Sequence, residues 1–375
     1  MRAGRREGDR VTPPASQPGG GGDDASARAR FGQGDPVPTT RSRRSRLLRR
    51  LAVALAAAVV LLVGGTLAAA PLLEKHGIYV IPPSPQRYAD IAVDRMEDGL
   101  AADPATVAEV RARVAAKVAD ARSYGATYPA LRKAVTQLGG DHSAFLTPDE
   151  AAVEFRGAPP TTGGPEPRPT VTTADGITTI VVPTLVGGDD AAHQRYIDAG
   201  AQALVAAAPT TTRGWVVDLR GNRGGDMWPM LAALSPLLDE GEVMSFESSD
   251  TSLPVTVQGG AVADDGKVVE TSAAGRVPGS LPIAVLTDGM TGSSGEAAAL
   301  AFVGQAGVRS FGQPTYGFST ANEPRTLFDG AIVNLTNAVD ADRTGKRYGV
   351  PIVPDVVVDD AGITAAVDAW FDAPR

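Results

Sequence analysis

The chain has 375 residues, of which 43% are hydrophobic, so it can form one large domain or two modest ones around a buried core. It contains no cysteine, which excludes disulfides, thiolate zinc sites and cysteine nucleophiles, and its three histidines argue against a multi-histidine metal site. Residues 1–50 hold 12 Arg and 5 acidic residues, a charge of +7, while the remainder holds 23 basic and 38 acidic residues, a charge of -15, which argues against nucleic-acid binding by this acidic body.

The N-terminal part is typical of a membrane anchor. Residues 1–46 are rich in Gly, Pro, Ser and Arg and predict a disordered basic tail in the cytoplasm. Residues 51–73 carry no charge and follow a cluster of arginines, so we expect a transmembrane signal-anchor helix over 47–73. A cleaved signal peptide is the alternative, because Ala68-Ala69-Ala70 is a small-residue site. In both cases the rest of the chain is expected outside the cytoplasm, and the anchored form would be a single-pass protein of the cell membrane.

A small helical subdomain is expected after the anchor. Residues 74–85 contain Pro82-Pro83-Ser84-Pro85 and predict a stiff spacer, and the subdomain itself covers 86–150. Apolar residues recur there at helical spacing in three stretches, 91–100, 105–121 and 128–138. Residues 151–170 become rich in Gly, Pro and Thr and predict a linker.

Residues 171–375 predict an α/β core. Short β-branched runs alternate there with Ala-rich helical runs, which is typical of helices packed on a sheet. The expected strands are 177–182, 215–219, 283–287, 308–311 and 331–337, and the expected helices are 191–208, 227–238 and 295–305. The segment 243–281 lacks a helical period and predicts β-hairpins.

A candidate nucleophile lies between an expected strand and an expected helix. The run Thr291-Gly292-Ser293-Ser294-Gly295-Glu296 follows a buried strand and leads directly into a helix. Ser293 would lie at this turn with its Oγ exposed, and N–H groups at the helix N-terminus would face an oxyanion. Glu296 in the first turn suits the same helix dipole. The structural alternative is that Ser293 or Ser294 only caps the helix.

A second glycine-rich loop follows another expected strand. The run Asp218-Leu219-Arg220-Gly221-Asn222-Arg223-Gly224-Gly225-Asp226 could supply N–H donors as half of an oxyanion hole. It is not a phosphate-binding loop, since no Lys-Ser or Lys-Thr follows the glycines. The alternative is a plain strand–helix connection.

A candidate general base lies just after the third helical stretch, in Gly139-Gly140-Asp141-His142-Ser143. Imidazole suits proton transfer near neutral pH, and the alternative is a surface or capping histidine. We expect the other two histidines to be solvated: His76 just outside the membrane, and His193 at the polar start of the 191–208 helix.

Together these segments resemble the S41 serine peptidases, the tail-specific or carboxyl-terminal processing protease family. The resemblance covers roughly 86–360 and rests on the order and spacing of the three motifs above and of three later runs. These are Phe311-Gly312-Gln313-Pro314-Thr315-Tyr316-Gly317, Leu327-Phe328-Asp329-Gly330-Ala331 and Ile352-Val353-Pro354-Asp355. It implies a crotonase/ClpP-like ββα core and a serine-type peptidase activity.

The resemblance also favours a histidine base over a lysine base. Many members use a Ser–Lys dyad, but Tyr316-Gly317-Phe318-Ser319 stands here where that lysine would be, and Phe318 cannot take a proton. The segment around His142 is similar to the catalytic histidine region of the branch that includes tricorn protease and the nisin resistance protein. The runs 291–296 and 225–231 look closest to the nisin resistance protein type, in which the first serine of the pair is the nucleophile, and this serine maps to Ser293. Only about 25 residues separate Thr147 from Val171, so gating by an inserted PDZ domain is not expected.

The predicted activity is therefore hydrolysis of extended peptides or protein tails by a Ser293–His142 dyad through an acyl-enzyme. The expected oxyanion donors are the N–H groups of Ser294 and of Gly224 or Gly225. Asp141 and Glu296 are possible supporting residues. No metal or organic cofactor is expected. An inactive peptide-binding scaffold and an acyl or ester hydrolase are the alternative functions, because fold alone does not fix the substrate.

Overall fold

The computed structural model describes residues 47–62, 65, 81–155 and 166–374, which fall into two compact units, Met1–Gly65 and Thr66–Arg375. In the first unit, residues 47–62 are helical. No helix among the described residues is long and apolar enough to cross a bilayer. Several predicted segments lie outside the described residues. They are the expected tail, residues 63–64 and 66–73 of the expected anchor, most of the spacer with His76, and residues 156–165 of the expected linker. The anchor and the domain boundaries remain predictions.

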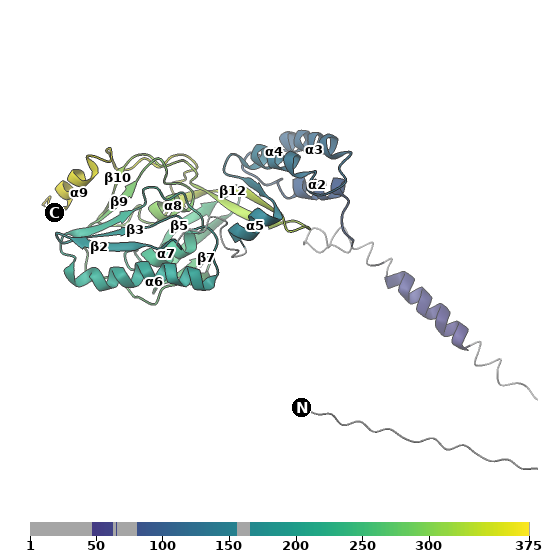
Figure 1. Cartoon of the computed structure of the whole chain (residues 1–375), viewed down its shortest axis with the longest axis horizontal. Coiled ribbons are helices and arrows are strands. Elements are labelled where there is room, and N and C mark those ends of the chain that lie inside the picture. Colours follow the sequence, from purple (N-terminus) through teal and green to yellow (C-terminus); the bar gives the residue numbers. More distant parts are fainter. Residues whose placement is uncertain (1–46, 63–64, 66–80, 156–165, 375) are drawn as a thin grey trace, which may run out of the picture. The chain divides into compact units, whose positions relative to one another are not determined.

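A six-stranded sheet forms the centre of the second unit (Figure 1). Its strands follow the order β13-β10-β9-β4-β3-β2, and all neighbours are parallel except β2, which is antiparallel to β3. Both β4 and β9 are buried along their whole length, as expected for parallel strands covered on both faces. The strands are β2 (Thr170–Ala174), β3 (Ile177–Val181), β4 (Gly214–Asp218), β9 (Ile283–Thr287), β10 (Val308–Gly312) and β13 (Val356–Val357).

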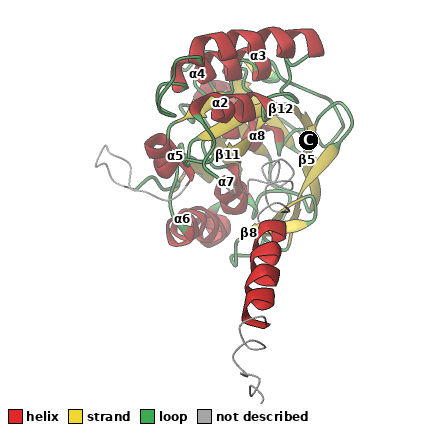
Figure 2. Ribbon diagram, turned by 90° about the vertical axis from the view of Figure 1, so that its right-hand side faces the viewer, coloured by secondary structure: helices red, strands yellow, loops and turns green. Residues whose placement is uncertain are grey.

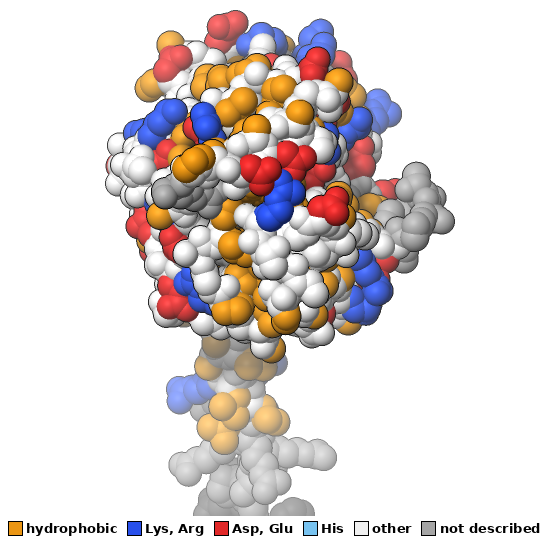
Figure 3. Space-filling model, turned by 90° about the vertical axis from the view of Figure 1, so that its left-hand side faces the viewer, with side chains coloured by type: hydrophobic (Ala, Val, Ile, Leu, Met, Phe, Trp, Pro, Cys, Tyr) orange, Lys and Arg blue, Asp and Glu red, His pale blue; other side chains and the backbone are white. Residues whose placement is uncertain are grey.

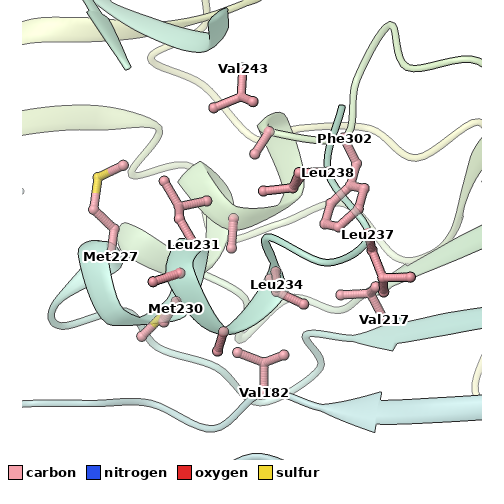
Figure 4. Close-up of a cluster of buried hydrophobic side chains, with 14 of the residues drawn as sticks. Val182, Val217, Met227, Met230, Leu231, Leu234, Leu237, Leu238, Val243 and Phe302 are labelled. Carbon is pink, nitrogen blue, oxygen red and sulfur yellow. The ribbon is translucent and has the colours of Figure 1, made fainter. Parts of the chain in front are cut away.

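Alternate residues of these strands enter two different cores. Trp215 and Val217 of β4 pack into the larger core with α6 (Asp190–Ala207), α7 (Met227–Leu234) and α8 (Ser294–Leu300). Figure 4 shows Val217 in this cluster with side chains of α7. Val216 faces the opposite side and packs under α9 (Ile363–Phe371).

A second sheet of seven strands runs β1-β12-β5-β6-β7-β8, with β11 paired to β12. All its pairs are antiparallel, so the expected hairpins of 243–281 are present as β5 to β8. The strands are β1 (Ala144–Leu146), β5 (Gly241–Glu247), β6 (Ser252–Gln258), β7 (Ala261–Asp264), β8 (Lys267–Thr271), β11 (Thr320–Thr326) and β12 (Ile332–Asp342).

Three N-terminal helices pack together on this second sheet: α2 (Pro85–Asp94), α3 (Pro104–Val118) and α4 (Tyr128–Gly139). Ser84 and Asp103 cap the first two, each followed by a proline at the first helical position. Figure 2 shows the three helices together above β12. Their core includes Val333 and Leu335 of β12, so this helical cluster is completed by residues from the C-terminal half of the chain.

Most expected elements coincide with observed ones, but several differ in length. Strand β12 extends to Asp342, beyond the expected 331–337, and α2 ends at Asp94, so only the first part of the stretch 91–100 is helical. The helix expected over 227–238 ends at Leu234, because Pro236 has no N–H to continue the helical hydrogen bonds. The helix expected over 295–305 ends at Leu300. Elements that we did not expect are β1, β2, β11, β13, α9 and α5 (Pro148–Phe155).

The outer face of the six-stranded sheet is only partly covered by α9. A hollow of about 340 Å³ lies there, between β2, β3, β4 and α9. Its two arginines are already in ion pairs, Arg213 with Asp368 and Asp372 and Arg220 with Asp218 and Asp360. Figure 3, which views the molecule from this side, shows acidic and basic side chains interspersed among apolar ones.

Candidate active site

The backbone of Ser293 is held in an unusual conformation between β9 and α8. Its φ of 52° and ψ of -122° lie in a region that residues with a side chain rarely adopt. Two hydrogen bonds fix the turn: the Gly292 N–H donates to the Asn222 carbonyl (2.9 Å), and the Ser293 N–H donates to Glu296 Oε2 (2.9 Å). The surrounding structure therefore maintains this strained conformation, which places Ser293 Oγ at the start of α8.

His142 lies in the turn between α4 and β1. Gly140 ends α4 with a φ of 87°, which favours glycine and turns the chain back towards the second sheet. Strand β1 then pairs with β12, which also pairs with β11. This pairing brings His142 next to Thr320, the first residue of β11, and the Asn322 side-chain amide donates to the His142 carbonyl (3.0 Å).

The two predicted catalytic side chains meet at hydrogen-bond distance. His142 Nε2 lies 3.0 Å from Ser293 Oγ, and His142 Nδ1 lies 2.7 Å from Thr320 Oγ1. The imidazole also stacks on the ring of Phe318, with centroids 4.5 Å apart and an angle of 17° between the planes. When Nδ1 carries the proton and donates it to Thr320, Nε2 has a lone pair free to accept the Ser293 proton.

Burial lowers the pKa of His142 from its usual value to about 4. The cause is the loss of solvent around the ring, which disfavours the imidazolium. His142 is consequently neutral at pH 7, the state that a general base requires.

Glu296 is completely buried behind the candidate nucleophile, Ser293. Besides the Ser293 N–H, its carboxylate accepts the Thr315 hydroxyl (2.5 Å) and the Gly317 N–H (3.0 Å). Burial raises its pKa, while these three donors favour the ionised form. Burial together with the charge of Glu296 raises the pKa of Asp340 well above its usual range. Thr315 is in turn bound by Ile352, whose N–H donates to Thr315 Oγ1 (2.7 Å).

The loop of residues 220–226, here called the glycine loop, packs directly against the nucleophile turn. A Cβ on Gly224 would lie 2.7 Å from Ser293 Cβ, and one on Gly225 would lie 1.8 Å from the Leu185 carbonyl oxygen. The Gly224 N–H donates to Asn222 Oδ1 (2.9 Å), whereas the Gly225 and Ser294 N–H groups have no hydrogen-bond partner among the described residues. Of the two glycines, Gly225 is thus the one whose N–H is available to a substrate.

Of the predicted supporting residues, Glu296 lies in the site and Asp141 does not contact the imidazole. Asp141 is exposed, and the Nδ1 atom of His142 faces Thr320 instead. Sequence analysis missed Thr320 and Asn222. Neither belongs to a recognisable pattern: Thr320 begins a polar edge strand, and Asn222 is one polar residue in a loop.

His193 is not the solvated surface residue that we expected. Its side chain is only 15% exposed and lies near two carboxylates, Glu270 and Asp226. The expectation was wrong because the polar start of α6 is covered by β8, which is distant in sequence.

Residues 193–358 match peptidase family S41. The chain is 34% identical over 297 residues to the nisin-resistance protein of Lactococcus lactis subsp. lactis, an alignment that covers 78% of this chain and 89% of that protein. A lipoprotein from Streptococcus agalactiae has a similar structure, with a TM-score of 0.65 and 27% identity over 78% of this chain and 98% of that one. The photosystem II D1 C-terminal processing protease has the same fold, with a TM-score of 0.50 and 16% identity over 74% of this chain and 94% of that one.

Proposed function

Since the chain belongs to peptidase family S41 and is a serine-type peptidase, we propose that it cleaves peptide bonds with Ser293 as nucleophile and His142 as general base. The observation that carries this proposal is the 3.0 Å distance between Ser293 Oγ and His142 Nε2, in a turn whose strained backbone is fixed from two sides. A nucleophile within hydrogen-bond reach of a neutral base is the arrangement that acyl transfer needs.

In the proposed reaction, His142 Nε2 takes the Ser293 proton as Oγ bonds to the peptide carbonyl carbon. The resulting imidazolium gives this proton to the leaving amine as the C–N bond breaks, which leaves an acyl-enzyme. Water then attacks the ester carbon while His142 accepts a proton from that water. His142 passes this water-derived proton to Ser293 Oγ as the C–Oγ bond breaks and the acid product leaves. Throughout the reaction Thr320 Oγ1 accepts a hydrogen bond from the Nδ1–H group, which keeps the proton on Nδ1 and leaves Nε2 available for proton transfer.

The proposed oxyanion donors are the N–H groups of Ser294 and Gly225. The first lies at the positive end of α8, and the second comes from the glycine loop that packs on the same turn. The Ser294 hydroxyl donates to the Gly225 carbonyl (2.6 Å) and thereby fixes the two segments to each other.

The proposed substrates are extended peptides or protein tails bound between the helical cluster and the α/β core. This position is supported by the dyad, because His142 follows α4 of the helical cluster and Ser293 begins α8 of the core. The named similarity to a nisin-resistance protein makes nisin one peptide to test beside a general peptide library. We also propose that the chain is anchored in the cell membrane by residues 47–73, with the peptidase outside the cytoplasm, on the charge pattern of its N-terminal part.

Labelling with a fluorophosphonate probe, combined with turnover of peptide and ester libraries, tests the proposal. The wild-type chain should be labelled at Ser293 and should hydrolyse peptides, and Ser293→Ala should lose both properties. Ser249→Ala, at an exposed hairpin serine, is the matched control and should behave like the wild type. Absence of labelling in a folded wild-type chain would instead identify a peptide-binding scaffold, and turnover of esters alone would identify an acyl hydrolase.

A further inference from the structure

Three segments meet around the His193 side chain near the start of α6, which lies beside α7 (Figure 1). Nδ1 lies 3.0 Å from Glu270 Oε1 on β8, and Nε2 lies 3.3 Å from the Gly187 carbonyl oxygen. Asp226 Oδ2, at the N-cap of α7, is 3.8 Å from Nε2. The proposed reaction uses none of these groups.

The partners of the two ring nitrogens indicate which protonation state fits. A carbonyl oxygen can only accept, so Nε2 must carry a proton to bond Gly187. An ionised carboxylate can also only accept, so Nδ1 must carry a proton to bond Glu270. Imidazolium is the one form that donates from both nitrogens, and its charge also separates the carboxylates of Glu270 and Asp226.

The cluster is connected to the glycine loop by short contacts. The Asp226 N–H donates to the Leu185 carbonyl (2.7 Å), and the Leu185 N–H donates to the Gly224 carbonyl (3.2 Å), so residues 185–187 run beside Gly225. His193 holds this strip through Gly187 and faces the carboxylate that directly follows Gly225. The ring also packs against Gly188, where a Cβ would lie 3.2 Å from its Cδ2 atom.

We propose that protonated His193 is a positioning residue that holds the glycine loop, and with it the Gly225 oxyanion donor, in place for catalysis. The inference rests on the proposed function, since it concerns the oxyanion hole of the same reaction. Loss of the proton would remove one of the two donated hydrogen bonds and the attraction to Asp226. The strip 185–187 and the loop would then be less well fixed, and an oxyanion donor that is misplaced loses much of its effect.

The proposal predicts a loss of activity on the alkaline side. The charged groups that face His193 are Glu270 from β8 and Asp226 from the N-cap of α7, and both favour the imidazolium. The hydrogen bond to Glu270, in opposition to burial and aided by Asp226, raises the pKa of His193 above its ordinary value of about 6.5. Activity should therefore decline roughly ten- to hundredfold as pH rises through that raised pKa.

The experiment compares kcat/KM between pH 5.5 and 9.5 for the full wild-type chain and three variants, with a library peptide as substrate. His193→Lys keeps the charge and should remove the alkaline decline. His193→Gln should lower the plateau roughly ten- to hundredfold and also abolish the decline. Glu270→Gln removes the partner that raises the pKa of His193, so the decline should begin at lower pH.

Histidine NMR on the labelled wild-type chain gives a readout that does not depend on activity or on the folding of a variant. Only three histidines are present, and single His→Gln replacements assign them. The resonance of His193 should titrate above pH 6.5. A neutral His193 below that pH, or an alkaline decline that persists in His193→Lys, would overturn the inference. These results would leave the proposed function intact, which fails separately if Ser293→Ala remains active.

Discussion

The Nδ1 atom of His142 lies 2.7 Å from the hydroxyl of Thr320, a residue 178 positions away in the chain. A neutral hydroxyl thus occupies the place that a carboxylate holds in a Ser–His–Asp triad. The hydroxyl can accept a hydrogen bond from the Nδ1–H group and orient the ring, but it supplies no negative charge to stabilise an imidazolium. The pKa of His142 therefore stays low, at about 4, under the influence of burial.

Replacing Thr320 tests this orienting contact. Thr320→Val keeps the shape of the side chain but leaves the buried Nδ1 proton without an acceptor, a loss of about 1.4–2.7 kcal/mol. We expect kcat to fall roughly 10- to 100-fold with little change in KM. Thr320→Ser keeps the hydroxyl and should retain most of the activity. Equal activities of the Val and Ser variants would contradict an orienting role.

If His142 is the general base as proposed, its low pKa should set the acid limit of activity. Only neutral imidazole can accept the Ser293 proton, so kcat/KM should stay constant from neutral pH downwards and fall as pH drops through about 4. Phe318 covers the ring, so Phe318→Ala should admit water, raise the pKa and move the acid limb to higher pH. Phe318→Leu, which keeps apolar cover, should move the limb less. An acid limb near pH 6.5 in the wild type would show that the ring is solvated.

The lowered pKa of His142 also affects the stability of the fold. In the unfolded chain histidine titrates near about 6.5, above its folded value, so the unfolded state binds more protons between these two pH values. Burial of neutral His142 consequently destabilises the fold as pH falls from about 6.5 to about 4. Thermal unfolding of wild type and His142→Gln over this range should show a steeper loss for the wild type. Parallel curves would contradict the assigned pKa.

The strained backbone of Ser293 predicts an opposition between stability and function. Its φ of 52° is unfavourable for any residue with a Cβ and acceptable for glycine. Ser293→Gly and Ser293→Ala should both be inactive, but the glycine variant should be more stable by about 1–2 kcal/mol. Chemical denaturation of the two variants measures the difference. An alanine variant as stable as the glycine variant would mean that the turn relaxes.

Glu296 should be important for both stability and rate. In Glu296→Gln, the side-chain amide group can accept on one atom only, so at least one of the three donors on Ser293, Thr315 and Gly317 loses its partner. We expect a destabilisation of about 1–3 kcal/mol and a lower kcat, because the nucleophile turn loses a fixed point. Glu150→Gln is the matched control: its ion pair with Arg132 is exposed and should contribute less than about 1 kcal/mol. Equal effects of the two substitutions on unfolding would exclude a special role for Glu296.

Sequence patterns could single out Ser293 as the candidate nucleophile because its context is local. Ser293 follows a strand whose five residues are all buried and begins a helix, and both elements are readable from neighbouring residues. The candidate base was harder to predict, since His142 meets Ser293 only through the pairing of β1 with β12 and of β12 with β11. No pattern within a short window carries that information.

The contacts that sequence analysis missed arise from tertiary pairing. Strand β11 is an edge strand that contains Pro324 and mostly polar residues, so its sequence lacks the alternation of apolar and polar residues that predicts a strand. For this reason neither β11 nor its first residue, Thr320, was predicted. The polar start of α6 likewise indicated a surface position for His193, although β8 covers it. In both cases the contacting residue, His142 for Thr320 and Glu270 for His193, is far away in sequence, and only the tertiary fold brings the two residues together.

The bond from the Ile352 N–H to Thr315 has a consequence for the order in which the protein is made. When a ribosome has just completed the nucleophile turn, the residues that fix Glu296 and orient His142 have not yet been synthesised. A nascent chain that ends before Ile352 carries the serine and the histidine but lacks the segment that braces Thr315. The hydrogen-bonded support behind the nucleophile turn can therefore be complete only after Ile352 has been synthesised.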